Sequence, residues 1–493
     1  MSLQEEHIRI VRDLSRMGSY GRAEGESKDS FPKSFYPVPE HVRAYDSDVV
    51  LIIGPRGAGK SELFRAVIEL KLLPAIARNA PGIRLPPVDS PRTSWVAGYP
   101  IGIDFPDARG LTQFFRRRLN ADEALELWFT YLIRALWNEI DPDGQKVLAS
   151  IKNRPGGDAE ANYQAFRLLG NTALLALDRL DSALTASDRM VFVGYDELDT
   201  LGGADWETMN RAVRGLVGFW SSYTRRWKRI RAKIFLRTDL YQRVGAAGGA
   251  DLAKLAANRA EISWNDRNLY SMLVKRIANS SDALLEYCEK SKIRFHHDSV
   301  LGQIPEISKL EDVRPFIDRL AGQYMGAGVK KGLTSRWLLE HIRDGRGHAL
   351  PRPLVRLIEA SAEFQINSSV APRWPRILSP MSLRHALDTV SEEHVKQSVN
   401  EWPWMNRLAS SLRGEQVPWL RREIENVFEK SWNRLWGTAG SERPPAEEPR
   451  GFVDYLVEVG IFRARSDGRL DVADLFLAGL GLKRKGGVRQ RLV

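Results

Sequence analysis

Short apolar runs of strand length alternate with helix-type patterns over the first half of the chain. The runs are Val49–Ile53, Tyr99–Phe105, Met190–Gly194 and Lys233–Leu236, with Asn258–Trp264 as a shorter fifth, and helical patterns lie near 110–141 and 160–187. β-Branched and aromatic residues fill most of the runs, which is typical of strands buried in a sheet. Strands separated by helices predict an α/β fold, a parallel sheet flanked by helices.

From about residue 265 the pattern becomes helical, first over 267–280 and then over 310–325 and 334–343. A helical region that follows a parallel sheet predicts a lid, which transmits changes at the sheet by moving. We therefore expect four segments. They are a lead-in over 1–45, an α/β core over 46–264, a helical lid over 265–365 and a C-terminal domain over 366–493. Within the lead-in, residues 19–41 are expected to be irregular.

The last fifty residues carry a hairpin signal. Ser466-Asp467-Gly468 separates two short strand patterns, Phe462–Arg465 and Arg469–Val472, and a helical pattern precedes them. The stretch 441–450, SERPPAEEPR, has the composition of a linker or long loop. A helix followed by a hairpin predicts a small winged-helix-like α+β domain at this end.

The residues after the first apolar run carry the clearest chemistry. They are Gly54, Pro55, Arg56, Gly57, Ala58, Gly59, Lys60 and Ser61, with Glu62 next in the helix. This is G-x-x-x-x-G-K-S between a strand and a helix, the phosphate-binding loop. Glycines let backbone N–H groups turn inward at a phosphate, and the helix dipole adds positive potential. Lys60 would reach the β- and γ-phosphates and the Ser61 hydroxyl would bind Mg²⁺, so the chain is expected to bind a nucleoside triphosphate, ATP, with Mg²⁺.

A pair of carboxylates follows the Met190–Gly194 run. Asp196 and Glu197 lie at the end of a buried strand, where an unpartnered carboxylate is costly. A magnesium-bound water beside the phosphates is a natural partner for Asp196. Glu197 would then polarise the attacking water, which predicts hydrolysis rather than binding alone. An acidic loop after a core strand is the structural alternative.

The Lys233–Leu236 run ends in Arg237-Thr238-Asp239. A polar group there would lie between the ends of the two earlier strands and touch the γ-phosphate or the attacking water. Arg237 and Thr238 are both candidates for this sensor role, and a salt bridge or a helix cap by Thr238 or Asp239 is the structural alternative.

Two further arginines are candidates for contact with the nucleotide. Arg259 lies at the mouth of the short strand, where ring-forming ATPases place an arginine that reaches the γ-phosphate of a neighbouring subunit. Arg352 lies near two prolines that begin a helix, from which it could fold back onto the nucleotide. Arg356, one turn further, is the alternative to Arg352.

The composition shows that the chain is basic, and it excludes several classes of protein. The chain has 493 residues, 43% hydrophobic and 27% charged, with a net charge of +11 and a single cysteine, Cys288. Its apolar runs are too short to span a membrane, its first residues lack the apolar core of a signal peptide, and one cysteine excludes an intrachain disulfide or a cysteine-rich zinc site. We expect a cytoplasmic protein, and its charge favours an anionic partner such as DNA.

Two basic segments are candidates for contact with nucleic acid. The tail supplies Lys483, Arg484, Lys485, Arg489 and Arg491 without an acid, and could lie along phosphates. The run 225–231, RRWKRIR, mixes charge with an aromatic residue, but it equally fits a solvated helix end. Trp402 and Trp404 are expected to belong to a hydrophobic core rather than to a base-stacking platform.

With GPRGAGKS, MVFVGYDELD, KIFLRTD, NRAEISW and LPRPLVRL in this order, the chain resembles the AAA+ and STAND branch of P-loop ATPases over roughly residues 40–360. More closely, it is similar to a prokaryotic family of predicted AAA-type ATPases with a C-terminal winged helix. That family often occurs in mobile or defence-related gene neighbourhoods. Arg-Thr-Asp replaces the asparagine common at the sensor strand of AAA+ proteins, and is nearer to STAND and KAP-type switches.

The resemblance and the residues together allow two main functions. The first is a Mg-dependent ATPase that couples its nucleotide state to DNA binding, in anti-phage defence or another DNA transaction. The second is a STAND-like switch that senses a protein ligand, forms a homo-oligomer on ATP and activates a partner effector. A phosphotransferase is a third possibility, which the Asp196-Glu197 pair disfavours.

Overall fold

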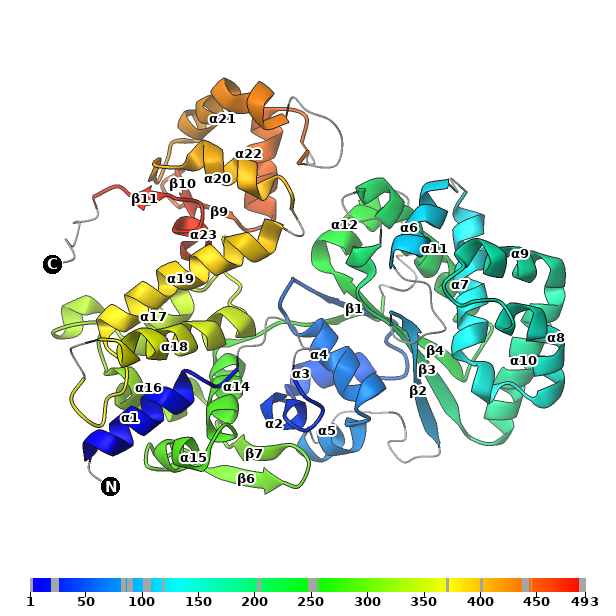
Figure 1. Ribbon diagram of the computed structural model, residues 1–493, viewed down its shortest axis with the longest axis horizontal. Coiled ribbons are helices and arrows are strands. Elements are labelled where there is room, and N and C mark those ends of the chain that lie inside the picture. Colours follow the sequence, from blue (N-terminus) through cyan, green and yellow to red (C-terminus); the bar gives the residue numbers. More distant parts are fainter. Residues whose placement is uncertain are drawn as a thin grey trace. The chain divides into compact units, whose positions relative to one another are not determined.

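The computed structural model describes residues 3–18, 26–80, 86, 92–100, 108–117, 120–201, 205–246, 255, 257–368, 372–399, 402–436, 443–444 and 446–486 (Figure 1). Its contacts divide the chain into two compact units. One holds residues 37–263, and the other holds residues 1–36 together with 264–493. Within the described residues, no helix has both the length and the apolar character needed to cross a bilayer.

The unit of residues 37–263 is built on a five-stranded sheet. Its strands are β1 (Leu51–Gly54), β2 (Thr93–Tyr99), β3 (Met190–Tyr195), β4 (Ile230–Arg237) and β5 (Ala260–Glu261), in the spatial order β2-β3-β4-β1-β5. All neighbouring pairs are parallel, which confirms the α/β fold class. β4 lies between β1 and β3, and its last residue, Arg237, is in register with Gly54.

One expected strand is placed differently. The sequence predicts a strand over Tyr99–Phe105, but β2 runs over Thr93–Tyr99 and residues 101–107 lie outside the described residues. Pro100 follows β2 directly, and a proline cannot donate to a strand ladder. The apolar residues after Pro100 imitate a strand, while the true strand, TSWVAGY, contains polar residues that weaken its signal.

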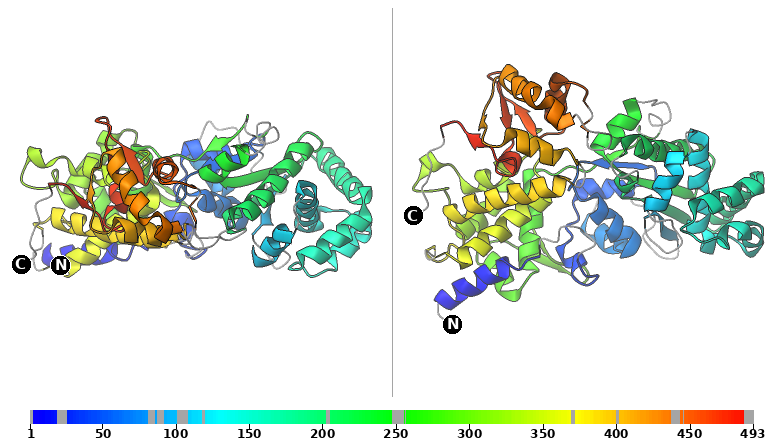
Figure 2. Two further views of the ribbon diagram at one scale, coloured as in Figure 1. Left: turned by 90° about the horizontal axis from the view of Figure 1, so that it is seen from above. Right: turned by 45° about the horizontal axis from the view of Figure 1, so that its top comes forward.

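Helices surround this sheet. They are α3 (Pro39–Val42), η2 (Arg43–Tyr45), α4 (Lys60–Phe64) with its π-helical continuation η3 (Arg65–Glu69), α5 (Leu73–Asn79), α6 (Ala108–Arg117), α7 (Ala121–Ala135), η4 (Trp137–Glu139), α8 (Pro142–Lys152), α9 (Ala159–Leu169), α10 (Asn171–Ala186), η5 (Leu198–Thr200), α11 (Trp206–Tyr223) and α12 (Thr238–Ala246). Helices α6–α10 gather at one side of the sheet (Figures 1 and 2). Three of these helices begin at capping residues. The side chains of Asn120, Asp141 and Asp158 accept backbone N–H groups at the starts of α7, α8 and α9, which fixes where each helix begins.

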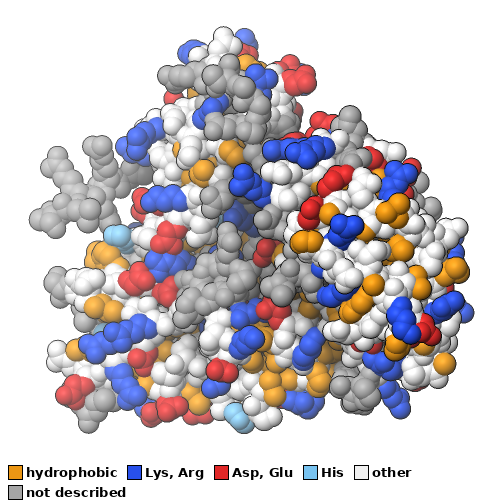
Figure 3. Space-filling model, turned by 45° about the vertical axis from the view of Figure 1, so that its right-hand side comes forward, with side chains coloured by type: hydrophobic (Ala, Val, Ile, Leu, Met, Phe, Trp, Pro, Cys, Tyr) orange, Lys and Arg blue, Asp and Glu red, His pale blue; other side chains and the backbone are white. Residues whose placement is uncertain are grey.

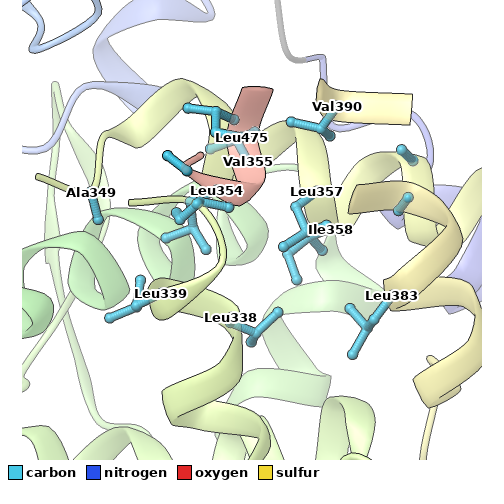
Figure 4. Close-up of a cluster of buried hydrophobic side chains, with 14 of the residues drawn as sticks. Leu338, Leu339, Ala349, Leu354, Val355, Leu357, Ile358, Leu383, Val390 and Leu475 are labelled. Carbon is cyan, nitrogen blue, oxygen red and sulfur yellow. The ribbon is translucent and has the colours of Figure 1, made fainter. Parts of the chain in front are cut away.

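The other unit is mostly helical. Its first part contains α1 (Leu3–Leu14), α2 (Phe31–Ser34), α14 (Asp266–Ala278), α15 (Asp282–Glu289), β6 (Phe295–Asp298), β7 (Gly302–Pro305), η6 (Leu310–Val313), α16 (Arg314–Ala321), η7 (Val329–Lys331), α17 (Thr334–Glu340), α18 (Pro351–Ile366) and α19 (Pro380–Val399). Figure 4 shows leucines of α17, α18 and α19 converging with Leu475 in one apolar cluster.

Two expectations for this unit need correction. The stretch 19–41 is not irregular throughout, because α2 lies within it. Phe31 of α2 is buried, and before this stretch α1 buries Ile10, Val11 and Leu14 in the core of this unit. The helix expected over 310–325 ends at Ala321, because Gly322 takes a positive φ of 89° that stops the helix.

The C-terminal part follows the order helix, strand, two helices and a hairpin. Its elements are α20 (Met405–Leu412), β8 (Gln416–Val417), α21 (Arg421–Trp436), α22 (Pro449–Glu458), β9 (Phe462–Ala464), β10 (Leu470–Val472), α23 (Asp474–Leu477) and β11 (Lys483–Arg484). β9 and β10 pair antiparallel around the Ser466-Asp467-Gly468 turn, as the sequence predicts. Trp404 is buried and lies edge-on to Phe452, which confirms its place in the core.

The loop between α17 and α18 is joined closely to this C-terminal part. The Gly345 N–H donates to the Gly460 carbonyl at 2.5 Å, and a Cβ at position 345 would lie 2.1 Å from the Phe462 carbonyl oxygen. Asp344 also lies against Gly460. Only glycine at position 345 allows two backbone segments to approach this closely.

Candidate functional site

The loop after β1 has the backbone that the sequence requires of it. Gly57 and Gly59 take φ values of 77° and 96°, in the left-handed region that side chains disfavour. The Lys60 ammonium folds back and donates to the carbonyls of Gly54 and Pro55 at 2.9 Å each. The helix that starts at Lys60 has its first N–H groups directed at the loop, which suits an anionic ligand.

Lys60 is held in a desolvated position. Its side chain is buried, and burial lowers the pKa of the ammonium to about 8, although the Asp196 carboxylate opposes the shift. The Arg237 guanidinium adds to the lowering. A buried ammonium with only carbonyl partners gains strongly from a phosphate, because the ligand supplies the negative charge that the protein does not place in contact with it.

Asp196 lies at the end of β3 and is 5% exposed. Burial raises the pKa of this carboxyl to about 6, while hydrogen bonds from the Ser61 hydroxyl and the Glu197 backbone N–H oppose the shift. The structure thus brings together the two oxygen ligands predicted for Mg²⁺. A P-loop magnesium site takes its remaining ligands from phosphates and water, so this donor set fits. Within the described residues, no group of three or more His, Cys, Asp or Glu forms a separate metal site.

Glu197 follows directly and is held in an unusual backbone conformation. Its φ is 51°, the left-handed region, although it is not a glycine. The Thr200 hydroxyl donates to the Glu197 carbonyl at 2.7 Å and secures this turn. A side chain that is held in a costly backbone conformation at a strand end is typical of a functional position.

Arg237, at the end of β4, is bound by carboxylates. Its guanidinium donates to both oxygens of Asp239, at 3.0 and 2.7 Å, and to Asp199 at 3.3 Å. Thr238 begins α12, so both sensor candidates lie at the end of the strand between β1 and β3. Sequence reasoning missed Asp199 as part of this arrangement. Its signal was its place three residues after Asp196, within the short helix η5.

The two remaining arginines lie farther along the chain. Arg259 is exposed, donates to Glu261 at 2.9 Å and lies over the Tyr241 ring. Arg352 lies in the first turn of α18, in the other unit. Arg356, the alternative to Arg352, donates to Glu363 of α18 and to Glu393 of α19, at 2.8 Å each. Its guanidinium is therefore already engaged in ion pairs.

The basic run 225–231 is partly paired within its own unit, since Arg226 and Arg229 form ion pairs with Asp178 and Asp188. Arg226 pairs with Asp178, which also accepts from the Trp227 indole N–H. The Asp181 carboxylate accepts the backbone N–H groups of Lys228, Arg229 and Ile230. These contacts favour the structural interpretation of the run, as a connection into β4, and the contact with nucleic acid stays a prediction.

The basic tail divides into two kinds of residue. Arg484 donates to both oxygens of the buried Asp471 at 2.9 Å and to Asp474 at 2.5 Å, a structural ion pair. Lys483 and Lys485 are exposed, with Lys485 3.7 Å from Glu423. Arg489 and Arg491 lie outside the described residues.

Comparison with known proteins gives remote structural similarities only. No family model matches the chain, and no curated protein matches it. The chain is similar to the solved structure of the Aeropyrum pernix ORC2 protein in ADPNP–ADP complexes, with 13% identity, a TM-score of 0.29, and 89% of this chain and 90% of that chain covered. It is also similar to Cdc6p from Pyrobaculum aerophilum, with 14% identity, a TM-score of 0.28, and 86% and 83% covered. The fold assignment rests on the strand order and loop geometry described above.

Proposed function

We propose that this protein is an AAA-type ATPase that binds and hydrolyses MgATP and couples its nucleotide state to DNA binding. The observation that carries the proposal is the meeting of three groups at one sheet edge. Lys60 is buried with carbonyl partners, and beside it the Ser61 hydroxyl is hydrogen-bonded to a buried Asp196. Phosphate and magnesium supply the charges that this arrangement needs.

Each residue then has a role in binding and hydrolysis. Magnesium, when bound, supplies positive charge beside the β- and γ-phosphates, and Ser61 and Asp196 would hold it. Lys60 would exchange its two carbonyl partners for phosphate oxygens. Glu197 would accept the proton of the attacking water. Arg237 or Thr238 would report whether the γ-phosphate is present, and Arg259 would serve a neighbouring copy of the chain.

The DNA part of the proposal rests on the C-terminal elements. The order α20, β8, α21, α22, β9, β10 is that of a winged helix, a frequent DNA-binding module. Lys483, Lys485, Arg489 and Arg491 remain candidates for phosphate contact, whereas Arg484 is already used in folding. A role in defence against phage, with an effector encoded nearby, is an extension drawn from the family resemblance alone.

One observation favours the second function, a STAND-like switch with a protein ligand. Arg237 is tied to Asp199 and Asp239 at the point where a γ-phosphate sensor is expected. Breaking these ion pairs would accompany ATP binding and give a slow, two-state device rather than a rapid cycle.

The experiment that separates the two functions is ATP turnover by the purified protein with and without duplex DNA. Lys60→Ala and Glu197→Gln serve as controls for binding and for hydrolysis. Stimulation by DNA that both substitutions abolish supports the DNA-coupled ATPase. Turnover near zero in both conditions, with ATP retained by Glu197→Gln, overturns it and supports the switch.

A further inference from the structure

The net charge does not by itself locate a surface for DNA. On the face drawn in Figure 3, Lys and Arg side chains alternate with Asp and Glu and form no uninterrupted basic area. Several basic residues that look available in the sequence, such as Arg226 and Arg484, are paired with carboxylates. A DNA contact therefore has to be sought where basic residues lack acidic partners and a rigid backbone presents them.

One segment of the helical region meets this condition. Between Asp318 and Glu340 the sequence contains no acid, but it contains Arg319, Lys330, Lys331 and Arg336. Lys330, Lys331 and Arg336 are exposed, and among the residues described neither lysine forms an ion pair. The two lysines belong to the stretch 322–333, GQYMGAGVKKGL, which follows α16 and which we call the VKK hairpin.

The VKK hairpin is held by its backbone. Tyr324 and Leu333 form an antiparallel bridge, Met325 N–H donates to the Gly332 carbonyl at 3.1 Å, and Thr334 N–H donates to the Gln323 carbonyl at 2.9 Å. Its base is anchored because Met325 is buried and its carbonyl accepts from Arg384 of α19 at 2.7 Å. The hairpin is thus a fixed projection from the core rather than a loose loop.

Glycines shape its tip. Gly328 and Gly332 flank Val329–Lys331 with φ and ψ of 100° and −178°, and of 78° and 156°, a region open to glycine almost alone. The Lys331 stem lies over Gly326, where a Cβ would come within 2.9 Å of it. Three glycines therefore set the course of the tip and leave room for a lysine stem along it.

The tip presents an apolar residue beside two cations. Val329 is 74% exposed, so its side chain is accessible to a partner that the lysines bind. Adjacent lysines fit the two sides of a phosphate backbone, and small glycines allow a close approach to it. A single valine suits contact with sugar or base surfaces in a groove, but is too small to hold a protein on a membrane.

We propose that the VKK hairpin is a second DNA contact, in which Lys330 and Lys331 bind backbone phosphates and Val329 packs into the groove between them. This inference rests on the proposed DNA-binding function and adds to it a site outside the winged helix. It is a contact with the backbone and with DNA shape, so it carries little sequence preference.

The test measures binding of the full-length protein to fluorescein-labelled duplex DNA at several salt concentrations. Lys330→Gln/Lys331→Gln removes two phosphate contacts, so the slope of log affinity against log salt should fall in magnitude by about 1.8, and affinity at about 0.1 M salt by about 60-fold. Lys292→Gln/Lys396→Gln removes the same charge from exposed positions elsewhere in this unit and should leave the slope unchanged. Val329→Ser should weaken binding several-fold without changing the slope.

The outcomes separate this inference from the function on which it rests. If the wild-type protein binds no DNA with or without ATP, the proposed DNA-binding function fails. If the wild type binds DNA and the two double variants bind alike, the hairpin inference alone is overturned. Loss of binding to vesicles containing anionic lipid, with DNA binding intact in Lys330→Gln/Lys331→Gln, would replace DNA by a membrane surface and also overturn it.

Discussion

Two buried aspartates, one in each unit, differ in how completely the protein satisfies them. Asp471 in β10 accepts two bonds from Arg484 at 2.9 Å, one from Arg465 at 3.2 Å and one from the Val472 N–H at 2.8 Å. Asp196, directly after β3, accepts from Ser61 and from a backbone N–H, while Lys60 beside it donates to carbonyls instead.

The difference separates structural charge from functional charge. A buried carboxylate that is fully matched by guanidinium groups stabilises one conformation of the chain and has no capacity for a ligand. A buried carboxylate that is matched only by neutral donors keeps its affinity for a cation, and its raised pKa records that need. Removing the Asp196 carboxylate should therefore lower activity but not stability, and removing the Asp471 carboxylate should lower stability but not activity.

The largest effect is expected from Asp196→Asn. The amide keeps the size of the side chain but cannot hold Mg²⁺, so ATP turnover should fall by about a thousand-fold. The midpoint of thermal unfolding should not fall, because the substitution removes a costly buried charge. Turnover within a few-fold of the wild type, measured by phosphate release at saturating MgATP, would contradict the assignment of Asp196.

Asp471→Asn should show the reverse pattern. Removing this carboxylate takes away the buried counter-charge that Arg465 and Arg484 share, although Asp467 and Asp474 still face them. The free energy of unfolding should therefore fall by about 3 kcal/mol, the low end of the range for a broken buried ion pair. Urea unfolding followed by tryptophan fluorescence measures this change, and ATP turnover below the transition should stay at the wild-type level. Asp29→Asn, at an exposed position elsewhere in this unit, is the control and should leave the transition in place.

The pH dependence of MgATP binding sharpens the comparison further. Asp196 has a pKa of about 6 and must be ionised to bind Mg²⁺, so affinity should fall by up to about tenfold for each pH unit below 6. Lys60 has a pKa of about 8 and attracts phosphate only when protonated, so affinity should also fall as the pH rises through 8. Titration with a fluorescent ATP analogue from pH 5 to 9 should therefore give a maximum between the two pKa values. An affinity that changes in one direction across this range would contradict it.

The smallest effect is expected where the basic run 225–231 is altered. Arg226→Gln/Arg229→Gln should change DNA affinity by less than about twofold, because both arginines are already paired, with Asp178 and Asp188. Anisotropy with the duplex used for the VKK hairpin gives a direct comparison. A loss as large as that of Lys330→Gln/Lys331→Gln would show that ion pairing in the free protein does not identify unused cations.

The sequence predicted the phosphate loop and the strand ends because their signals are local. The loop motif lies in eight consecutive residues, and β3 and β4 are apolar runs that end in the polar residues of interest. The place of the β4 end between the ends of β1 and β3 was predicted as well, whereas the places of β2 and β5 at the sheet edges were not. The roles of Glu197, Arg259 and Arg352 stay predictions.

Long-range pairing was not predictable in the same way. Nothing near Arg226 announces Asp178, which lies in a helix 48 positions earlier, and Arg484 is matched by a residue on a hairpin strand. The helix predicted over 310–325 runs four residues into the VKK hairpin, because the positive φ of Gly322 that ends α16 leaves no mark in the hydrophobic pattern. In each case the deciding contact joins segments whose meeting depends on the whole fold.

The junction between Gly345 and Gly460 has a mechanical consequence. The hydrogen bond of 2.5 Å and the lack of space for a Cβ at position 345 hold the α17–α18 loop directly against the α22–β9 turn, so the two segments cannot move independently. A rotation of α18 would therefore be transmitted directly to the α22–β9 turn. A large side chain substituted at position 345 would force these two backbone segments apart, and would loosen the C-terminal part without altering its hydrophobic core.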